Sequence, residues 1–161
     1  MFNIIAAIGK NGELGKDGEL VFHLAKDMRF FKATTTGHKV LMGRKTWESL
    51  PSKLSNRFNM VVSRSELQGE MPDLVIGDLD KFISANEDTP DEIFVIGGGM
   101  LYEKMLPYCD RIYLTEIDSS AEADTFFPRF DKSLYEAEVV ESGIEQGLGY
   151  TITVYKKGEN G

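Results

Sequence analysis

The distribution of apolar residues along the chain predicts alternating strands and helices. Short, continuous apolar runs are typical of strands that are covered on both faces. Five segments have this pattern: residues 2–8, 39–42, 57–63, 74–76 and 93–96. Apolar residues at helical spacing favour helices, and they occur in residues 24–35, 44–50, 79–86 and 101–106. Alternating apolar and polar residues, typical of strands with one exposed face, occur in residues 111–117, 136–140 and 150–156.

This order of elements predicts an α/β fold with a mostly parallel sheet. Helical crossovers join parallel strands, and the helices then cover both faces of the sheet. The last two strands are expected to form an antiparallel hairpin around residues 143–149. Residues 9–19 are rich in glycine and are expected to form a long loop, and residues 121–130 are expected to be irregular. Long loops in compact domains are more often functional than idle.

Length and composition narrow the class of protein. A chain of 161 residues is expected to form one domain. It has 18 Lys and Arg against 26 Asp and Glu, and this net charge of −8 argues against nucleic acid or an anionic membrane as the main partner. Cys109 is the only cysteine, so no intrachain disulfide can form and a reducing compartment fits. Residues 1–10 resemble neither a signal peptide nor a membrane span. We therefore expect a soluble, cytoplasmic domain.

Three consecutive glycines follow the apolar run at residues 93–96: Gly97, Gly98 and Gly99. Without a Cβ atom, the backbone can turn sharply and lie against a bound molecule. The helix that follows would present free N–H groups, which favour an anion. The segment does not match the G-x-G-x-x-G spacing of a dinucleotide-binding turn. An ordinary glycine-rich turn between strand and helix explains the pattern equally well.

Two further junctions combine a strand end with cations and hydroxyl groups. Gly43 is followed by Arg44, Lys45 and Thr46, and the next strand ends in Ser63-Arg64. These groups suit a phosphate at a helix N-terminus, although a solvated basic turn would look the same. In an open parallel sheet, ligands lie beyond the carboxyl ends of the strands, where all three junctions fall.

The helix predicted over residues 24–35 carries an acid at an apolar position. Its inward stripe should contain Leu24, Asp27, Met28 and Phe31. An ionised carboxylate there is costly unless a cation or a hydrogen-bond donor meets it. An acid beside aromatic residues is suited to holding a flat, protonatable ring. The alternative is that Asp27 only complements the dipole in the first turn of the helix.

Five motifs occur in order along nearly the whole chain: GELVFHLAKDMRFFK, VLMGRKTWESLP, VVSR, FVIGGGMLYEKML and IYLTEID…DTFFP. Together they resemble the dihydrofolate reductase family. The resemblance implies the three-layer fold of that family for a single domain over residues 1–161, with an adenosine-binding subdomain at about residues 38–106. It implies a monomeric enzyme without a metal that reduces 7,8-dihydrofolate to tetrahydrofolate with NADPH.

The same resemblance implies the substrate side of the site. Asp27 would bind the pterin ring with support from Thr115, and Arg57 would bind the glutamate α-carboxylate, a bidentate role suited to a guanidinium. The implied catalytic residues are Asp27, Leu20, Phe22 and Thr115. The implied substrate-binding residues are Ile5, Ala6, Asp27, Met28, Phe31, Lys32, Leu50, Leu54, Arg57, Ile96 and Thr115.

On the cofactor side, the resemblance implies that NADPH lies against the glycine junctions. Arg44, Ser63 and Arg64 would hold the 2′-phosphate, and the loop at residues 9–19 would close over the nicotinamide. A cis peptide bond is expected between the first two glycines of the triplet. The implied cofactor-binding residues are Ala7, Leu14, Gly15, Gly43, Arg44, Lys45, Thr46, Ser63, Arg64, Ile96, Gly97, Gly98, Gly99, Met100, Leu101 and Tyr102.

The chain departs from the family pattern directly before Asp27. Family members usually have a Leu-Pro-Trp-x-Leu-Pro kind of segment, whereas residues 20–25 here are Leu-Val-Phe-His-Leu-Ala. Phe22 cannot donate the hydrogen bond that a tryptophan would give to an ordered water. Two alternatives therefore stay open: another NADPH-dependent pterin or pyrimidine reductase of the same fold, and a non-catalytic NADP-binding module.

We expect the Phe22→Trp variant to change kcat or its pH profile. The indole N–H restores the hydrogen-bond donor to an ordered water, and this changes the supply of the proton. The prolines would also have fixed φ at the entry to the helix, so loop closure is a second route to the same effect. The loss of NADPH absorbance with dihydrofolate as the only added substrate measures both quantities. An unchanged kcat and pH profile would refute a role for this departure.

Overall fold

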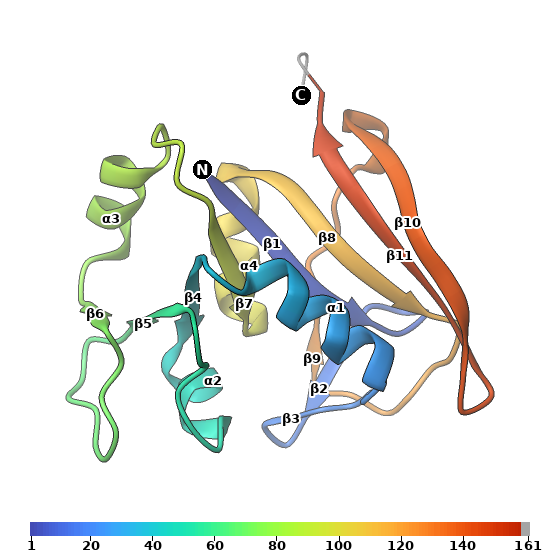
Figure 1. The fold of residues 1–161 in the computed structure, drawn as a ribbon, viewed down its shortest axis with the longest axis horizontal. Helices are drawn as coiled ribbons and strands as arrows, with labels where there is room; N and C mark the ends of the chain where they lie inside the picture. Colours follow the sequence, from blue (N-terminus) through green and yellow to red (C-terminus); the bar gives the residue numbers. More distant parts are fainter. Residues whose placement is uncertain (159–161) are drawn as a thin grey trace.

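The computed structural model describes residues 1–158 and contains one large sheet. Its strands are β1 (Phe2–Ile8), β4 (Lys39–Gly43), β5 (Phe58–Val62), β6 (Leu74–Ile76), β7 (Ile93–Gly97), β8 (Cys109–Ile117), β10 (Tyr135–Glu145) and β11 (Leu148–Lys157). They lie in the order β10-β11-β8-β1-β7-β4-β5-β6 (Figure 1). The strands from β8 to β6 are parallel to their neighbours, whereas β11 is antiparallel to both β8 and β10. The prediction of a mostly parallel sheet with a C-terminal antiparallel hairpin is confirmed.

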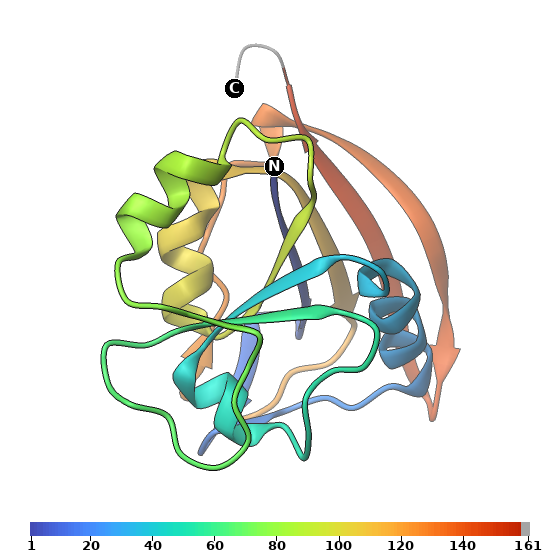
Figure 2. The ribbon, with the colours of Figure 1, turned by 60° about the vertical axis from the view of Figure 1, so that its left-hand side comes forward.

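Helices cover both faces of this sheet, as predicted. They are α1 (Ala25–Thr35), α2 (Arg44–Ser49), α3 (Leu79–Asn86) and α4 (Gly99–Met105), with short 3-10 turns at Leu106–Tyr108 and Lys132–Leu134. Successive side chains of a strand point to opposite faces. Ile4 of β1 therefore packs with residues of α3 and α4, whereas its neighbour Ile5 packs with residues of α1 and α2. Figure 2 shows α3 and α4 together on one side of the sheet and α1 on the other.

The two segments predicted to be irregular together form a small second sheet. Strands β2 (Glu13–Lys16), β3 (Glu19–Leu20) and β9 (Thr125–Phe126) pair in the order β3-β2-β9. Asp17 and Gly18, with φ of 51° and 82°, form the two-residue turn between β2 and β3. Asp-Gly is a residue pair that strongly favours such a turn, because both positions need a positive φ. The prediction of irregular structure at residues 9–19 and 121–130 is wrong in these parts.

The C-terminal hairpin is longer than predicted. Strands β10 and β11 continue to Glu145 and Leu148, so that only Gln146 and Gly147 form the turn, with φ of 52° and 77°. Gly143, predicted to lie in the loop, is a strand residue under the Tyr150 ring, where an added Cβ would come within 3.1 Å of the hydroxyl oxygen. Glycine marks a close approach here rather than a turn.

Two helix starts differ in how they are capped. Asp78 accepts a hydrogen bond from the Lys81 N–H (3.1 Å), as predicted for the N-cap of α3. Leu24 occupies the N-cap of α1 and has no side chain that can accept. Asp27 therefore lies in the first turn of α1. Within residues 1–158, no helix is both long and apolar enough to cross a membrane.

Candidate active site

The centre of the site is a hydrogen bond between α1 and β8. The Thr115 hydroxyl donates to Asp27 Oδ1 at 2.6 Å, and Thr115 is only 2% exposed. Burial raises the pKa of Asp27, the hydrogen bond from Thr115 opposes this, and the negative charge of Glu145 adds to the rise. Asp27 is thus a carboxyl group that accepts a proton more readily than an ordinary aspartate.

Apolar side chains from β1, β7, α1 and the segment between α2 and β5 form a cluster on the face of the sheet that α1 covers. Ile5 is buried in a cluster with Phe94, and the partly buried residues packed against it include Phe31, Leu50, Leu54 and Ile96. The structure therefore brings together most of the predicted substrate wall. Three predicted substrate residues are not members of this cluster: Ala6 faces the core beneath α3 and α4, Met28 is half exposed and Lys32 is exposed. The expectation that Met28 belongs to an inward stripe is therefore wrong.

Arg57 is held at the edge of this wall by contacts on two sides. Its guanidinium donates to Thr35 Oγ1 at 3.1 Å and to the Ser55 carbonyl at 2.9 Å. The guanidinium carbon lies 5.9 Å from the centre of the Phe31 ring. Partial burial lowers the pKa of Arg57 from its ordinary value, but a guanidinium stays charged at neutral pH. A fixed cation here can bind a carboxylate.

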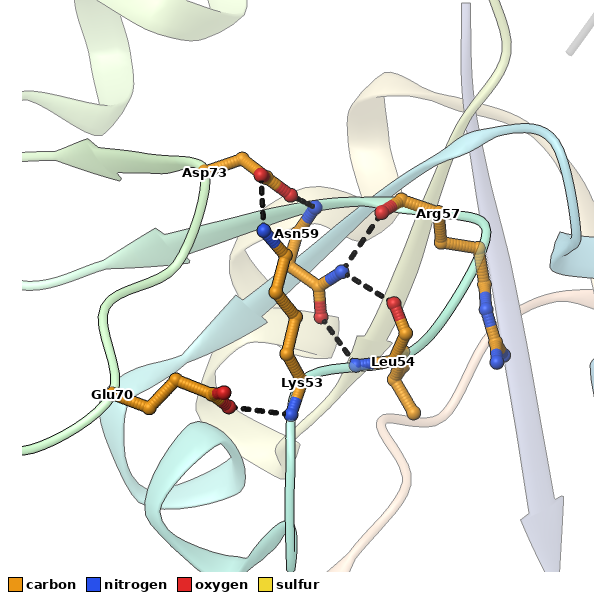
Figure 3. A network of polar contacts seen from close by, with 6 residues as sticks. All are labelled: Lys53, Leu54, Arg57, Asn59, Glu70 and Asp73. Carbon is orange, nitrogen blue, oxygen red and sulfur yellow. Dashed lines mark hydrogen bonds and ion pairs between the residues drawn. The ribbon is translucent and has the colours of Figure 1, made fainter.

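A buried asparagine that sequence reasoning missed holds the loop that carries Leu54 and Arg57. The Asn59 amide donates to the carbonyls of Leu54 (2.9 Å) and Arg57 (3.0 Å) and accepts from the Leu54 N–H (3.0 Å), as Figure 3 shows. The Asn59 side chain is 0% exposed. Its backbone N–H donates to Asp73, which also pairs with Lys53. Because one amide satisfies three backbone groups, it acts as a clamp on this loop.

The glycine junctions predicted from sequence meet in space. An added Cβ on Gly97 or Gly98 would lie 3.4 or 3.6 Å from Thr46 Oγ1, and one on Gly43 would lie 3.9 Å from the Gly97 carbonyl oxygen. The peptide bond between Gly97 and Gly98 is cis, as expected. Two strand ends thus form a backbone surface free of side chains next to a hydroxyl group.

The cations near these junctions are not equally available. Arg44 pairs with Glu48 on its own helix at 2.8 Å, and the Ser63 hydroxyl, which is buried, donates to the Ser65 carbonyl at 2.8 Å. Lys45 and Arg64 are exposed. Three residues are predicted to hold the 2′-phosphate: Arg44, Ser63 and Arg64. Of these, Arg64 needs the least rearrangement to meet a ligand.

The residues after the glycines have separate environments. Met100 is 89% exposed, whereas Leu101 and Tyr102 are buried. The Tyr102 hydroxyl donates to the Ile5 carbonyl at 2.8 Å, and burial together with the charge of Asp27 raises its pKa, so it stays protonated. Tyr102 thus ties α4 to the strand that carries part of the substrate wall.

The loop that contains β2 is anchored by a second polar residue that sequence reasoning missed. Glu13 is 2% exposed and accepts from the N–H groups of Asn11 (2.6 Å) and Ala121 (2.8 Å). Burial by itself would raise the pKa of Glu13, but these backbone hydrogen bonds outweigh it and the pKa is lowered. The next residues, Leu14 and Gly15, are buried, and a Cβ on Gly99 would lie 3.9 Å from Leu14 Cδ1.

The end of this loop reaches the side of the site near Asp27. Leu20 is 52% exposed, and Phe22 packs against a cluster that contains Leu24 and Tyr150. Ala7 belongs to the same cluster and lies beside Thr115 in the sheet register. Phe22 therefore fills an apolar position next to the helix start.

A protein-family model described as dihydrofolate reductase matches residues 1–157. The chain belongs to the dihydrofolate reductase family. It is 39% identical to a dihydrofolate reductase of Bacillus subtilis (strain 168) over 98% of this chain and 95% of that protein. It is 41% identical to one from Haemophilus influenzae over 87% of this chain and 86% of that protein.

A solved structure agrees with this membership in the dihydrofolate reductase family. The dihydrofolate reductase from Enterococcus faecalis, complexed with NADP(H) and RAB-propyl, superposes with a TM-score of 0.87 at 27% identity, covering 99% of this chain and 97% of that one. The three-layer fold expected from the resemblance is thereby confirmed. The subdomain boundary at about residues 38–106 and the roles of the individual site residues stay predictions.

The clamp described above predicts that Asn59→Ala weakens substrate binding and stability together. The variant leaves three backbone groups of Leu54 and Arg57 unsatisfied, which should lower the free energy of unfolding by roughly 2–4 kcal/mol. Urea denaturation measures this loss, and KM for dihydrofolate should rise while KM for NADPH stays close to the wild-type value. Ser55→Ala, an exposed position in the same loop, is the control. Equal KM values for dihydrofolate in the wild type and Asn59→Ala would contradict the clamp.

Proposed function

We propose that this protein reduces 7,8-dihydrofolate to tetrahydrofolate with NADPH, and that Asp27 and Thr115 hold the pterin ring. The observation that carries this proposal is the 2.6 Å hydrogen bond between these two side chains at the edge of an apolar wall, in a chain of the dihydrofolate reductase family. An acid in this setting can accept hydrogen bonds from the 2-amino group and N3 side of a pterin. Arg57 would bind the carboxylate at the other end of the substrate.

The contribution of Asp27 to catalysis would be electrostatic. Hydride addition at pterin C6 requires a proton at N5, and a nearby negative charge favours the protonated ring. The apolar neighbours Ile5 and Phe31 exclude water, which strengthens this interaction. The apolar wall would also orient the pterin, which lowers the entropic cost of bringing the reacting atoms together. The chain thus supplies orientation and charge rather than redox chemistry.

The residues at the glycine junctions fit NADPH. Gly97, Gly98 and Gly43 form a backbone surface without Cβ atoms, and the Thr46 hydroxyl borders it. A dinucleotide can lie against such a surface, with a phosphate at the N-terminus of α2. When bound, NADPH supplies the hydride. Leu14, which lies close to Gly99, and Leu20 would shield the reacting rings from water.

The assembly and location belong to the same proposal. We infer a cytoplasmic monomer that acts on a small molecule. The buried free thiol of Cys109, whose pKa is raised by burial, fits a reducing compartment because it needs no partner, and the net charge of −8 does not suit nucleic acid. Light scattering coupled to gel filtration measures the mass directly, and a dimer mass would contradict this inference.

Asp27→Asn should lower kcat/KM for dihydrofolate by roughly 100-fold or more, because it removes the negative charge at the pterin. NADPH binding, followed by fluorescence, should not change. If the wild type were as inactive as the variant, the non-catalytic NADP-binding module would be the better explanation.

The same variant should be at least as stable as the wild type at neutral pH. The pKa of Asp27 is raised in the folded protein. The free energy of unfolding therefore falls as pH rises from the ordinary aspartate value through the raised folded value. Asparagine removes that penalty and can still accept from Thr115. Urea denaturation at acidic and neutral pH measures the free energy of unfolding of both proteins. A clearly less stable variant at neutral pH would show that ionised Asp27 supports the fold.

Arg64→Ala should raise KM for NADPH about tenfold, because one charge-assisted contact to the 2′-phosphate is lost. KM for NADH should not change, since NADH lacks this phosphate. Arg44→Ala is the matched variant, and its effect should be smaller because Arg44 already pairs with Glu48. Comparable kcat/KM for both cofactors in the wild type would refute the assignment of a 2′-phosphate site.

A further inference from the structure

The first turn of α1 is capped by a residue that is far away in the sequence. Glu145, the last residue of β10, accepts hydrogen bonds from the backbone N–H groups of Ala25 (2.6 Å) and Lys26 (2.9 Å). Leu24, at the N-cap position, has no side chain that could do so. In both Figure 1 and Figure 2, the tip of the β10–β11 hairpin lies beside the start of α1. A carboxylate also complements the positive end of the helix dipole.

Further contacts attach the same turn to the hairpin. Leu24 is 2% exposed and packs in a cluster with Ile117, Tyr150 and Ile152 of strands β8 and β11. The Lys26 ammonium lies 5.9 Å from the centre of the Tyr150 ring. Each of residues 24–26 therefore contacts the strands β8, β10 or β11. Asp27 follows them directly, so its position depends on this attachment.

Resting on the function proposed above, we propose that Glu145 is a positioning residue for the reduction of dihydrofolate. It fixes the first turn of α1, keeps Asp27 within reach of Thr115 and places a second negative charge beside that pair. The hairpin then contributes to the chemistry although Glu145 itself touches neither substrate nor cofactor.

The hydrogen bond from Ala25 depends on a departure from the family pattern. Position 25 is where the Leu-Pro-Trp-x-Leu-Pro kind of segment has its second proline, and proline has no N–H to donate. With alanine there, the first N–H of the helix is a free donor at an exposed position, with no intrahelical acceptor. Glu145 provides an acceptor, which links this departure to the C-terminal hairpin.

The negative charge of Glu145 in the hairpin raises the pKa of Asp27, and the charge of Asp27 in turn raises that of Tyr102 in α4. Tyr102 stays neutral because burial raises its pKa. Glu145 also faces Tyr150, whose hydroxyl donates to Glu141 at 2.9 Å, and Arg29 faces the same tyrosine. The charge that favours a proton on Asp27 or on the bound pterin is therefore that of Glu145. Removing it should move the titration of the site to lower pH.

Three variants separate the hydrogen bonds from the charge. Glu145→Gln keeps an acceptor oxygen and loses the charge, whereas Glu145→Ala loses both. Ala25→Pro removes one donor and keeps the charge. Leu24 has φ of −102° and ψ of 128°, which suits a residue before proline, and proline is tolerated at the first helical position.

Both Glu145 variants should shift the alkaline limb of the kcat profile, and the Asp27 carboxyl titration seen by carbon NMR, about half a pH unit downwards. Glu145→Ala should in addition raise KM for dihydrofolate about fivefold and speed amide exchange at residues 25–27. Ala25→Pro should raise KM less and leave the titration in place. The control is Glu138→Gln, the same change of charge at an exposed position of the same strand, and it should match the wild type.

The positioning role and the reductase function fail separately. An inactive wild type refutes the reductase function. An active wild type whose Asp27 titration and KM are unchanged in both Glu145 variants refutes the positioning role. An equal shift in Glu138→Gln also refutes it, because the effect would then come from net charge alone.

Discussion

A carboxyl group at the edge of an apolar wall has to be met by a donor, and in this protein the donor comes from a different layer. Asp27 lies on α1 and Thr115 on β8, and their side chains meet at 2.6 Å. A hydrogen bond of this kind tolerates only small displacements, so the helix and the sheet must keep a fixed relation. Burial of Leu24, packing of Phe31 against the cluster around Ile5, and the carboxylate of Glu145 at the first turn all contribute to that relation. The chemistry proposed for Asp27 depends on this docking as much as on its own charge.

The substrate side of the site depends on a hydrogen bond between side chains. The cofactor side depends instead on backbone that carries no side chains. Gly43 and Gly97 come from strands β4 and β7, which are neighbours in the sheet. A Cβ on Gly43 would lie 3.9 Å from the Gly97 carbonyl oxygen and one on Gly97 would lie 3.4 Å from Thr46 Oγ1, so the two backbones form a surface without side chains next to Thr46. The two halves of the site are connected through β7, because Phe94 packs in the apolar wall while Gly97 ends the same strand.

Single polar side chains hold the irregular segments around the site. Asn59 satisfies the loop that carries Arg57, Glu13 satisfies the loop before β2, and Glu145 satisfies the start of α1. In each case one side chain binds two or more backbone groups that would otherwise be unpaired. This explains how segments without regular structure can position side chains on a rigid scaffold.

The order of strands and helices, the glycine junctions and the place of Asp27 in its helix could be predicted from sequence, because burial period and turn chemistry are local properties. The Asp17-Gly18 turn is local as well, and its two residue types by themselves favour a hairpin. The roles of Glu13 and Glu145 could not be predicted, since their partners Ala121 and Ala25 lie 108 and 120 positions away. The identity of a charged residue does not by itself determine whether its side chain will be solvated or buried. Only the packing of distant segments decides which backbone groups it meets, and therefore whether it serves the site.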